Sequence, residues 1–481
     1  MAFDYDVIIL GSGPAGFSCA MQSTKFDKNV LMVEADPSNL GGTWLNKGTV
    51  PSKALKEAAN LIQRFHTQFG DERGRKPYEK FRMEDLMLYK RSILEEKNKK
   101  VKHDLIKNEI DTVRGYGRII DKNTIEVTNQ FNKKTSYTAA NILISTGSSP
   151  QQPKNFELDH KTVLDYDSIL SLTHIPRRLV IVGSGVIAFE YATIFSALGT
   201  RITILSESDD LLPFLDKEIK EELIRILKNK NIQIYHESRV KKVGTNDLRN
   251  CMEVTFKLKG EKRKYVSETE HVLYVSSKKA NTRNLWSDEL QIKTDDSGFI
   301  NVNEFYQTNV SNIYAAGDVV GEASSAAASF VQGRLAACTM FDMPGDSPSK
   351  DIPYSIYSIP EISGIGLTEL KAKEIGIDVT VGRAYYRNLT QADIKHENEG
   401  ILKLVFRTDN LKLLGVHIIG NHAGDLVHLG QSIMAMDSSI KYFIEHVLNY
   451  PSYGEAYRIA AFNGVNRVHA AGVKYKKILE K

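Results

Sequence analysis

The stretch from Asp6 to Gly16, with the sequence DVIILGSGPAG, indicates the class of fold. Its opening residues are mostly aliphatic and β-branched, which is typical of a buried strand in a parallel sheet. Gly11, Gly13 and Gly16 follow at once. Glycines at this spacing allow a tight turn, the close approach of a pyrophosphate and close packing of a helix on the strand. The stretch therefore predicts a strand, a phosphate-binding turn and a helix.

A second strand supports this prediction. Val30–Val33 is again apolar, and Glu34 follows it directly. An acid roughly 20 residues after the first glycine is where a dinucleotide-binding unit bonds a ribose hydroxyl. The alternative is a glycine-rich turn with an incidental glutamate. Strand, helix and acid in this order favour a dinucleotide site.

The same pattern occurs a second time in the chain. Arg178–Val182 is another buried apolar strand, and Gly183, Gly185 and Ala188 follow it at the spacing of the first three glycines. Ala188 is still small enough for the helix to pack closely on its strand. Two such units predict two dinucleotide sites in an α/β fold.

The second unit differs where it should select its nucleotide. Ser206 stands at the position that corresponds to Glu34, and Glu207, Asp209 and Asp210 follow. A carboxylate at that position favours NAD, whereas a nearby arginine accommodates the 2′-phosphate of NADP. Carboxylates next to the site repel a 2′-phosphate. The segment therefore favours NAD(H), and NADP(H) stays open.

The chain length, the net charge and the number of cysteines limit the class of protein. A chain of 481 residues predicts two to four domains, and its net charge of +4 gives no sign of a nucleic-acid partner. The three cysteines are far apart, which favours a reducing compartment. No signal peptide or membrane-spanning run is expected. These features predict a soluble cytoplasmic protein.

A charged amphipathic helix is expected from about Phe81 to Glu109.

The segment Gly41–Lys53, GGTWLNKGTVPSK, resembles the redox-disulfide segment of the flavoprotein disulfide reductases, which has the pattern GGTCxNxGCxPSK. Gly42 and Thr43 match that pattern, and Trp44 and Thr49 replace its two cysteines. Neither side chain can form a disulfide or a thiolate. The resemblance implies that the flavin-binding frame is kept and that the sulfur relay is lost.

The resemblance also implies the domain order: residues 1–150 form the first part of the FAD-binding domain, 151–275 the NAD(P)-binding domain, 276–347 the second part of the FAD domain, and 348–481 an α+β dimerisation domain. The expected fold is two Rossmann-like domains followed by that C-terminal domain. Thr146 and Gly147 match the segment that passes the flavin, and Asp318 matches the aspartate that binds the ribityl chain. In the return segment, Tyr274–Asn281, Lys278 replaces an arginine of the family.

Four further positions concern catalysis. The family has a histidine that acts on the thiols, and Tyr450 replaces it, although the following Glu455 is kept. A phenol with a pKa of about 10 is a poor base near neutrality. The resemblance implies that Lys53 approaches the flavin and pairs with Glu190. These two are the candidate catalytic residues.

The C-terminal block, Asn449–Pro451 followed by Glu455–Arg458, is similar to that of the branch of soluble pyridine nucleotide transhydrogenases. The resemblance implies hydride exchange between NAD(H) and NADP(H) through FAD, in a homodimer. That branch keeps the first cysteine and has basic residues near positions 208 and 210, where this chain has Ser208 and Asp210. Two alternatives stay open: an NAD(P)H dehydrogenase that reduces a quinone or another small acceptor, and a non-catalytic flavin-binding or nucleotide-binding protein.

Trp44 either fills the space of the thiols or stacks with an acceptor. No metal site is expected, since His417, His422 and His428 are interpreted as ordinary core and surface histidines.

Overall fold

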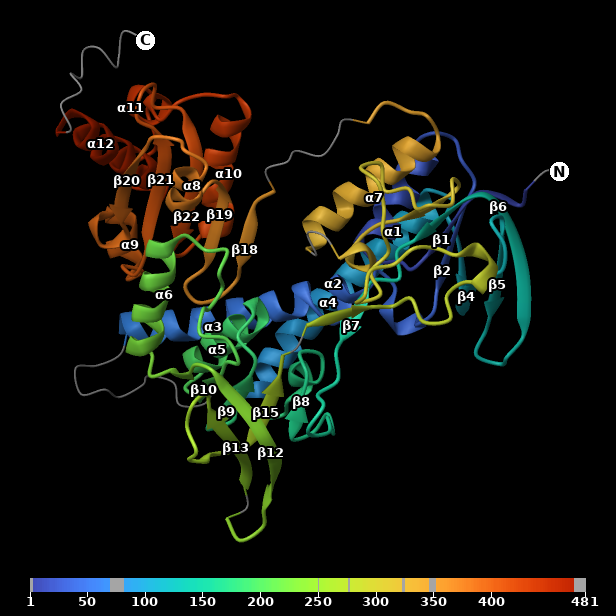
Figure 1. Ribbon diagram of the computed structural model, residues 1–481, viewed down its shortest axis with the longest axis horizontal. Coiled ribbons are helices and arrows are strands. Elements are labelled where there is room, and N and C mark those ends of the chain that lie inside the picture. Colours follow the sequence, from blue (N-terminus) through green and yellow to red (C-terminus); the bar gives the residue numbers. More distant parts are fainter. Residues whose placement is uncertain are drawn as a thin grey trace. The chain divides into compact units, whose positions relative to one another are not determined.

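The computed structural model describes residues 3–69, 82–249, 251–275, 277–321, 325–345 and 352–470. The chain forms two compact units (Figure 1). Unit 1 comprises residues 1–54, 87–152 and 276–350, and unit 2 comprises residues 55–86, 153–275 and 351–481. Helices α3 (Thr49–Phe69) and α4 (Met83–Lys107) contribute residues to both units.

Unit 1 is built on a mixed sheet. In the described part of the unit, seven strands have the order β3-β2-β1-β6-β5-β4, and β17 also pairs with β6. The long strand β6 belongs to two regions: its end runs parallel to β1 and β17, and its beginning runs antiparallel to β5. The strands are β1 (Tyr5–Leu10), β2 (Val30–Glu34), β3 (Asp111–Arg114), β4 (Tyr116–Ile119), β5 (Thr124–Thr128), β6 (Lys134–Ile144) and β17 (Ile313–Ala315).

Two helices pack on each other beside this sheet. They are α1 (Pro14–Thr24) and α7 (Ala326–Met340). A Cβ on Gly333 of α7 would lie 2.0 Å from the backbone oxygen of Ala15 in α1, so only glycine permits this close approach. The smaller elements of unit 1 are α2 (Thr43–Asn46) and the antiparallel pair β7 (Ser148–Pro150) and β16 (Lys278–Ala280).

Unit 2 contains a parallel sheet and an antiparallel meander. The parallel order is β11-β10-β9-β15-β8, and the meander is β12-β13-β14. Helix α5 (Val186–Ala197) follows β9, and α6 (Lys217–Asn229) lies between β10 and β11. The strands are β8 (Val163–Leu164), β9 (Arg178–Val182), β10 (Arg201–Leu205), β11 (Gln233–Tyr235), β12 (Ser238–Asn246), β13 (Cys251–Leu258), β14 (Tyr265–Thr269) and β15 (His271–Tyr274).

The C-terminal part of unit 2 is an antiparallel sheet with helices. Its order is β18-β19-β22-β21-β20. Helix α12 packs on β20, and a Cβ on Gly382 would lie 2.0 Å from the oxygen of Ala460. The elements are β18 (Tyr354–Ile356), β19 (Ile362–Gly366), α8 (Glu369–Glu374), β20 (Val379–Tyr385), α9 (Thr390–Lys395), β21 (Ile401–Arg407), β22 (Leu413–Ile419), α10 (Ala423–Ala435), α11 (Lys441–Glu445) and α12 (Glu455–Ala470).

The structure confirms the predicted fold class, with two βαβ units and a C-terminal α+β region. The predicted charged helix is α4, and Phe81, where it was expected to begin, lies outside the described residues. The four-segment domain division stays a prediction. In the described ranges, no helix is both long and apolar enough to cross a membrane.

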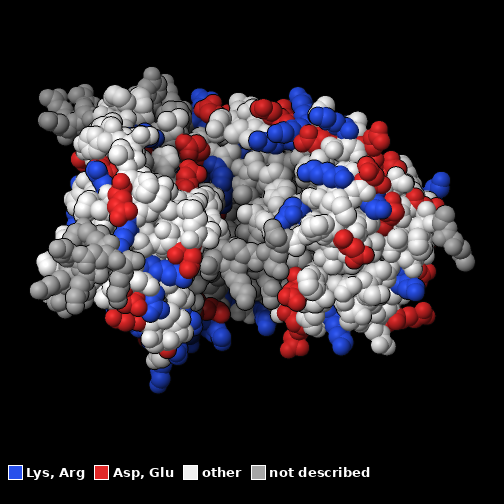
Figure 2. Space-filling view, turned by 90° about the horizontal axis from the view of Figure 1, so that it is seen from above, with Lys and Arg blue, Asp and Glu red and all other residues white. Residues whose placement is uncertain are grey.

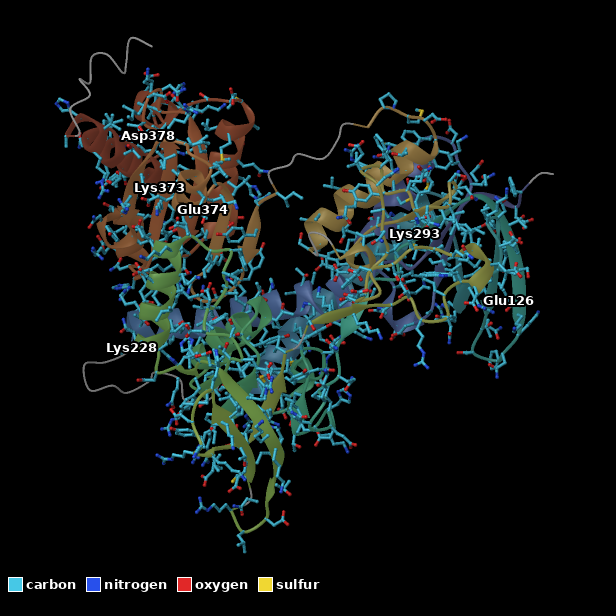
Figure 3. All side chains as sticks on the ribbon, viewed as in Figure 1. Glu126, Lys228, Lys293, Lys373, Glu374 and Asp378 are labelled. Carbon is cyan, nitrogen blue, oxygen red and sulfur yellow. The ribbon has the colours of Figure 1, made fainter. Side chains whose placement is uncertain are left out.

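Charged side chains lie on the surfaces of both units. Figure 2 shows basic and acidic side chains interspersed over one face, in keeping with the small net charge. Among those labelled in Figure 3, Lys373 and Glu374 lie on α8. Such mixed surfaces provide no large field of one sign.

Candidate dinucleotide-binding sites

The first turn closes through a hydrogen-bonded carboxylate. Glu34 Oε2 accepts from the Ser12 backbone N–H at 3.0 Å and from the Ser12 hydroxyl at 2.5 Å. Its other oxygen accepts the N–H of Asp36 at 3.0 Å. The Ser12 hydroxyl accepts in turn from the Gly41 N–H at 3.0 Å, which joins the turn to the segment that carries Trp44. The end of β2 and the turn after β1 are thus held together.

The glycines of the first turn have different roles. A Cβ on Gly11 would lie 2.5 Å from the Ser145 oxygen, and a Cβ on Gly42 would lie 2.5 Å from Gly13 Cα. Both glycines have a positive φ. A Cβ on Gly13, by contrast, would meet nothing within 4 Å. The backbone at Gly13 therefore faces open space at the start of α1, which fits a pyrophosphate at a helix N-terminus.

The Thr146–Gly147 segment is bonded to Asn281, the residue that follows β16. The Thr146 hydroxyl donates to the backbone oxygen of Asn281 at 2.9 Å, and the Asn281 side-chain amide donates to the Thr146 oxygen at 3.0 Å. Gly147 has a φ of 70°, and a Cβ there would again meet open space. This glycine thus combines a left-handed turn with an unobstructed approach, as a cofactor-binding segment requires.

Asp318 has a cationic partner that the sequence analysis did not assign to it. Lys278 Nζ lies 2.6 Å from Asp318 Oδ2, and the Ser148 hydroxyl donates to the same oxygen at 3.1 Å. Lys278 belongs to β16, which lies next to β7. The replacement of the family arginine by Lys278 was the signal, but only the tertiary structure shows that the carboxylate it meets is that of Asp318.

The segment Gly41–Lys53, which resembles the redox-disulfide segment, contains α2 and the first turn of α3. Trp44 lies in α2, and its ring meets Phe330 of α7 edge-on, with centroids 5.4 Å apart. Its buried Nε1 has no hydrogen-bond partner among the described residues. Thr49 begins α3, and Lys53 Nζ lies 3.4 Å from the Ser52 hydroxyl. The indole is therefore packed against α7, and its role beside the flavin stays a prediction.

The second turn closes through two hydroxyl groups. Ser184 Oγ and Ser206 Oγ lie 2.7 Å apart, and Ser206 is fully buried. The Ser206 hydroxyl also donates to the Ser208 backbone oxygen at 2.7 Å. A Cβ on Gly183 would lie 2.1 Å from the Val275 oxygen, whereas a Cβ on Gly185 would meet open space. The second turn therefore repeats the backbone arrangement of the first without its carboxylate.

Cations accompany the acidic residues after Ser206. Lys220 forms an ion pair with Asp210. Arg239 Nε lies 3.8 Å from Glu207 Oε1, and both side chains are more than two-thirds exposed. The repulsion of a 2′-phosphate that was predicted from these carboxylates is therefore weakened, because two of them have cations beside them. The cations come from α6 and β12 and not from positions 208 and 210.

Glu190 binds a loop of the C-terminal region. Its side chain is 6% exposed, and Oε1 accepts the N–H of Tyr357 at 2.8 Å. Lys56, one turn after Lys53 in α3, forms a buried ion pair with Glu361 at 2.6 Å, which the sequence analysis missed. Lys53 belongs to unit 1 and Glu190 to unit 2, so their pairing stays a prediction.

The positions of the family's acid–base pair have separate partners here. The Tyr450 hydroxyl lies 2.8 Å from the Thr390 hydroxyl, and Tyr450 is 65% exposed. Glu455 forms an ion pair with Arg458 at 3.1 Å. Within the described ranges, Tyr450 and Glu455 are therefore bonded to other residues and not to each other.

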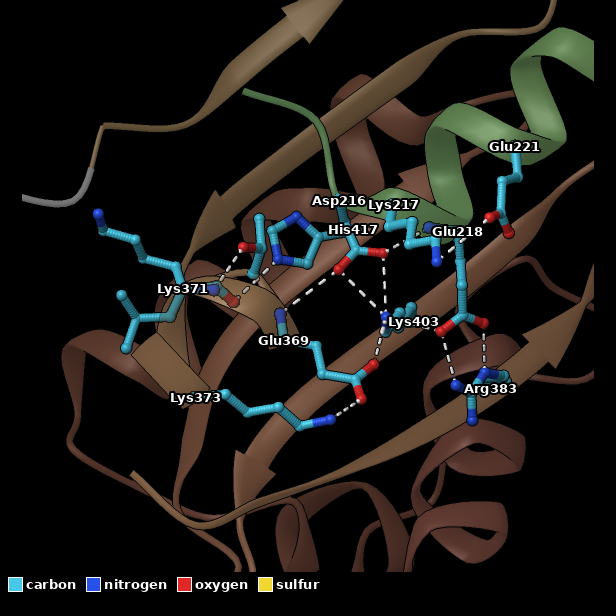
Figure 4. Close-up of polar contacts among 12 residues, drawn as sticks. Asp216, Lys217, Glu218, Glu221, Glu369, Lys371, Lys373, Arg383, Lys403 and His417 are labelled. Carbon is cyan, nitrogen blue, oxygen red and sulfur yellow. Dashed lines mark hydrogen bonds and ion pairs between the residues drawn. The ribbon is translucent and has the colours of Figure 1, made fainter. Parts of the chain in front are cut away.

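A buried ionic cluster lies between α6 and the C-terminal sheet (Figure 4). Lys403 of β21 is 1% exposed and contacts three carboxylates, those of Asp216, Glu218 and Glu369, at 2.7 to 3.0 Å. Arg383 of β20 adds a two-pronged contact to Glu218. Burial opposes the charge of Lys403, but the carboxylates outweigh it and raise its pKa. Since every carboxylate has a cation, the cluster is a structural clamp and not a catalytic group.

The histidines form no metal centre in the part of the chain that the structure describes. No group of three or more metal-ligating side chains is found there. His417 is buried on β22 beside the ionic cluster, where burial lowers its pKa. It therefore stays neutral near pH 7.

Comparison with known proteins agrees with this geometry. The model of the pyridine nucleotide-disulphide oxidoreductase family matches residues 5–333, and that of its dimerisation domain matches residues 352–461. Soluble pyridine nucleotide transhydrogenases from Marinomonas sp. (strain MWYL1) and Ectopseudomonas mendocina (strain ymp) are 37% and 38% identical over 474 residues, covering 96% and 97% of this chain and 99% of each relative.

Solved structures show the same fold at lower identity. The HOCl-induced flavoprotein disulfide reductase RclA from Escherichia coli has a TM-score of 0.85 at 22% identity, covering 95% of this chain and 99% of that chain. LpdA from Mycobacterium tuberculosis has a TM-score of 0.86 at 20% identity, with 95% and 98% covered. The chain belongs to the pyridine nucleotide-disulphide oxidoreductase family.

Proposed function

We propose that this protein is an FAD-dependent oxidoreductase that transfers hydride between nicotinamide nucleotides, NADH + NADP⁺ ⇌ NAD⁺ + NADPH. The observation that carries the proposal is the full-length identity of 37% to soluble pyridine nucleotide transhydrogenases, joined to two complete dinucleotide turns. When bound, FAD supplies the hydride exchange, and the protein supplies position and electrostatics.

Each site residue has an assigned part. The FAD-binding group comprises Gly11, Gly13, Gly16, Glu34, Gly42, Thr43, Lys53, Thr146, Gly147 and Asp318. The nicotinamide-nucleotide group comprises Gly183, Gly185, Ala188, Ser206 and Glu207. Lys53 and Glu190 are the proposed catalytic residues: Lys53 holds a positive charge at the cofactor, and the Glu190 carboxylate fixes the position of that charge.

The cysteines support a reaction without sulfur. Cys19, Cys251 and Cys338 are all unpaired, and none lies at the two family positions. Burial raises the pKa of the Cys19 thiol to about 12, so it is not a thiolate near neutrality. Alkylation of the folded protein should leave the activity unchanged.

The matched dimerisation domain supports a homodimer. We further place the protein in the cytoplasm, because a reducing compartment suits a chain with three unpaired cysteines.

Anaerobic titration of the purified yellow protein tests the function. We expect one reduced nucleotide to bleach the protein and the oxidised form of the other to restore its colour. Restoration by a quinone alone would identify an NAD(P)H dehydrogenase, and no bleaching would identify a non-catalytic binding protein. Lys53→Met should lower kcat by at least tenfold, with Lys47→Met, whose side chain is 44% exposed, as the matched control.

A further inference from the structure

Unit 2 contains a cavity of about 660 Å³ that the proposed function does not use. It lies between the first residues of β9, β10 and β11 and the meander β12-β13-β14. The second dinucleotide turn lies at the other end of β9, after Val182. The volume is within the range of roughly 300–1,000 Å³ that small-ligand sites occupy.

The sheet register directs basic and polar side chains into this cavity. Arg201 of β10 is paired with Arg178 of β9, and Thr203 is paired with both Val180 and Gln233. Side chains at paired positions, and at every second position along a strand, lie on one face of the sheet. The two guanidinium groups therefore stand side by side at the cavity wall. Like charges in that position destabilise a sheet unless an anion lies near them.

The carboxylates at the cavity do not neutralise all of its cations. Glu268 of β14 accepts from Arg178 at 3.3 Å and also from Arg249. Arg201 forms no ion pair with any residue that the structure describes. Glu253, the other carboxylate of the lining, accepts instead from the Asn246 amide at 2.6 Å. The lining thus has three guanidinium groups against two carboxylates, and one guanidinium has no counter-ion.

We propose that this cavity binds a small organic dianion, either a phosphomonoester or a dicarboxylate. Arg201 is its primary contact, because its donors are available, and Arg178 and Arg249 stand near enough to share the charge of a compact anion. The lining also includes the buried side chains of Val180 and Phe256, which suit an organic body better than a bare inorganic ion. The site is independent of the proposed hydride transfer.

Calorimetric titration of the FAD-loaded protein, first without NAD⁺ and then with saturating NAD⁺, tests the proposal. The probes are phenyl phosphate, succinate and inorganic phosphate. Binding of phenyl phosphate or succinate at one site per chain is the expected result, and the tighter of the two identifies the class of dianion. Failure of both to bind, or loss of their binding when NAD⁺ is added, would overturn the proposal. If inorganic phosphate binds as tightly as phenyl phosphate, the cavity does not recognise an organic body, and that part of the proposal is wrong.

Substitutions locate the binding. Arg201→Gln should weaken binding of the preferred probe by at least about tenfold, because it removes a charge-assisted contact. The matched control is Arg118→Gln, at an exposed position of β4, which should leave the binding of that probe unchanged. Arg201 is exposed, so the variant is expected to fold, and equal binding by the two variants would refute the site. Nucleotide-dependent bleaching should be the same in both, and this separates a failure here from a failure of the proposed function.

Discussion

The two dinucleotide turns use the same positions with different chemistry. In the first turn Ser12 donates to the carboxylate of Glu34, and in the second Ser184 contacts the hydroxyl of Ser206, with the partners 22 residues apart in both. The first turn, with its Glu34 carboxylate, suits a nucleotide that offers two ribose hydroxyls to that carboxylate. The second turn lacks that carboxylate and therefore repels a 2′-phosphate less, which suits a site that accepts two different nicotinamide nucleotides in succession.

The two units also hold a helix by different kinds of contact: α1 follows the first turn directly, and α6 follows β10 of the second unit. Helix α1 packs on α7 through the glycine–alanine contact at Gly333 and Ala15. Helix α6 of the second unit is joined to the C-terminal sheet by the ionic cluster around Lys403. A repeated motif therefore does not imply a repeated support.

The largest effect is expected for the cluster. Lys403→Met leaves the buried carboxylate of Asp216 without its cation and should destabilise unit 2 by about 3–5 kcal/mol. Urea unfolding, followed by circular dichroism, measures the change. Lys412→Met removes a partly exposed pair with Asp437 in the same region and should cost no more than about 1 kcal/mol. Equal costs for the two variants would show that the cluster is not a clamp.

The turn glycines should separate the two sites. Gly11→Ala places a Cβ against the Ser145 oxygen, and Gly183→Ala places one against the Val275 oxygen, each at a positive φ, with a local cost of about 2–4 kcal/mol. We expect the first variant to lose its yellow colour and the second to keep it but resist bleaching by NADH. Gly199→Ala has a similar φ with no contact within 4 Å and controls for backbone strain. Loss of colour in both test variants would contradict separate sites.

Acid should weaken the second unit through Glu218. Burial alone would raise its pKa, but Arg383 and Lys403 outweigh burial and lower it from 4.5 to about 2. The stabilisation is therefore present above pH 4.5 and is lost as the pH falls towards 2. We expect this loss of stabilisation to be about 1–2 kcal/mol, a value discounted because the Glu218 side chain is a quarter exposed. Urea midpoints between pH 5 and 3 measure it, and Glu218→Gln should flatten the dependence. An unchanged slope in that variant would assign the acid sensitivity elsewhere.

The smallest effect concerns nucleotide choice. Ser206→Glu restores the carboxylate of the first turn in the second, where it should bond ribose hydroxyls and repel a 2′-phosphate. We expect the ratio of kcat/KM for NADH to that for NADPH to rise by about tenfold, or about 1.4 kcal/mol. Glu207→Gln, at a largely exposed position, should change the ratio by less than about twofold. A ratio unaltered by Ser206→Glu would mean that another residue selects the nucleotide.

Much of the fold could be predicted because its signals are local. Residues 178–182 form β9 as predicted, and the expected strand Val30–Val33 lies within β2 (Val30–Glu34). Both are apolar runs with turn residues nearby, which a single sequence displays. The candidate site was predictable only where a motif carries its own geometry, as Gly11 and Gly183 do. The partners of Asp318 and Glu190 were not, because they lie far away in the chain.

The sequence by itself determined the two strand–turn–helix units, the loss of both redox cysteines and the absence of a histidine at Tyr450, since each depends on residue type and short spacing. Only the tertiary structure decided that Lys278 meets Asp318, that Lys220 and Arg239 accompany the acidic residues after Ser206, and that three arginines gather at one cavity. Electrostatic contacts depend on distance in space, and it is strand pairing and helix packing that bring separate segments within that distance.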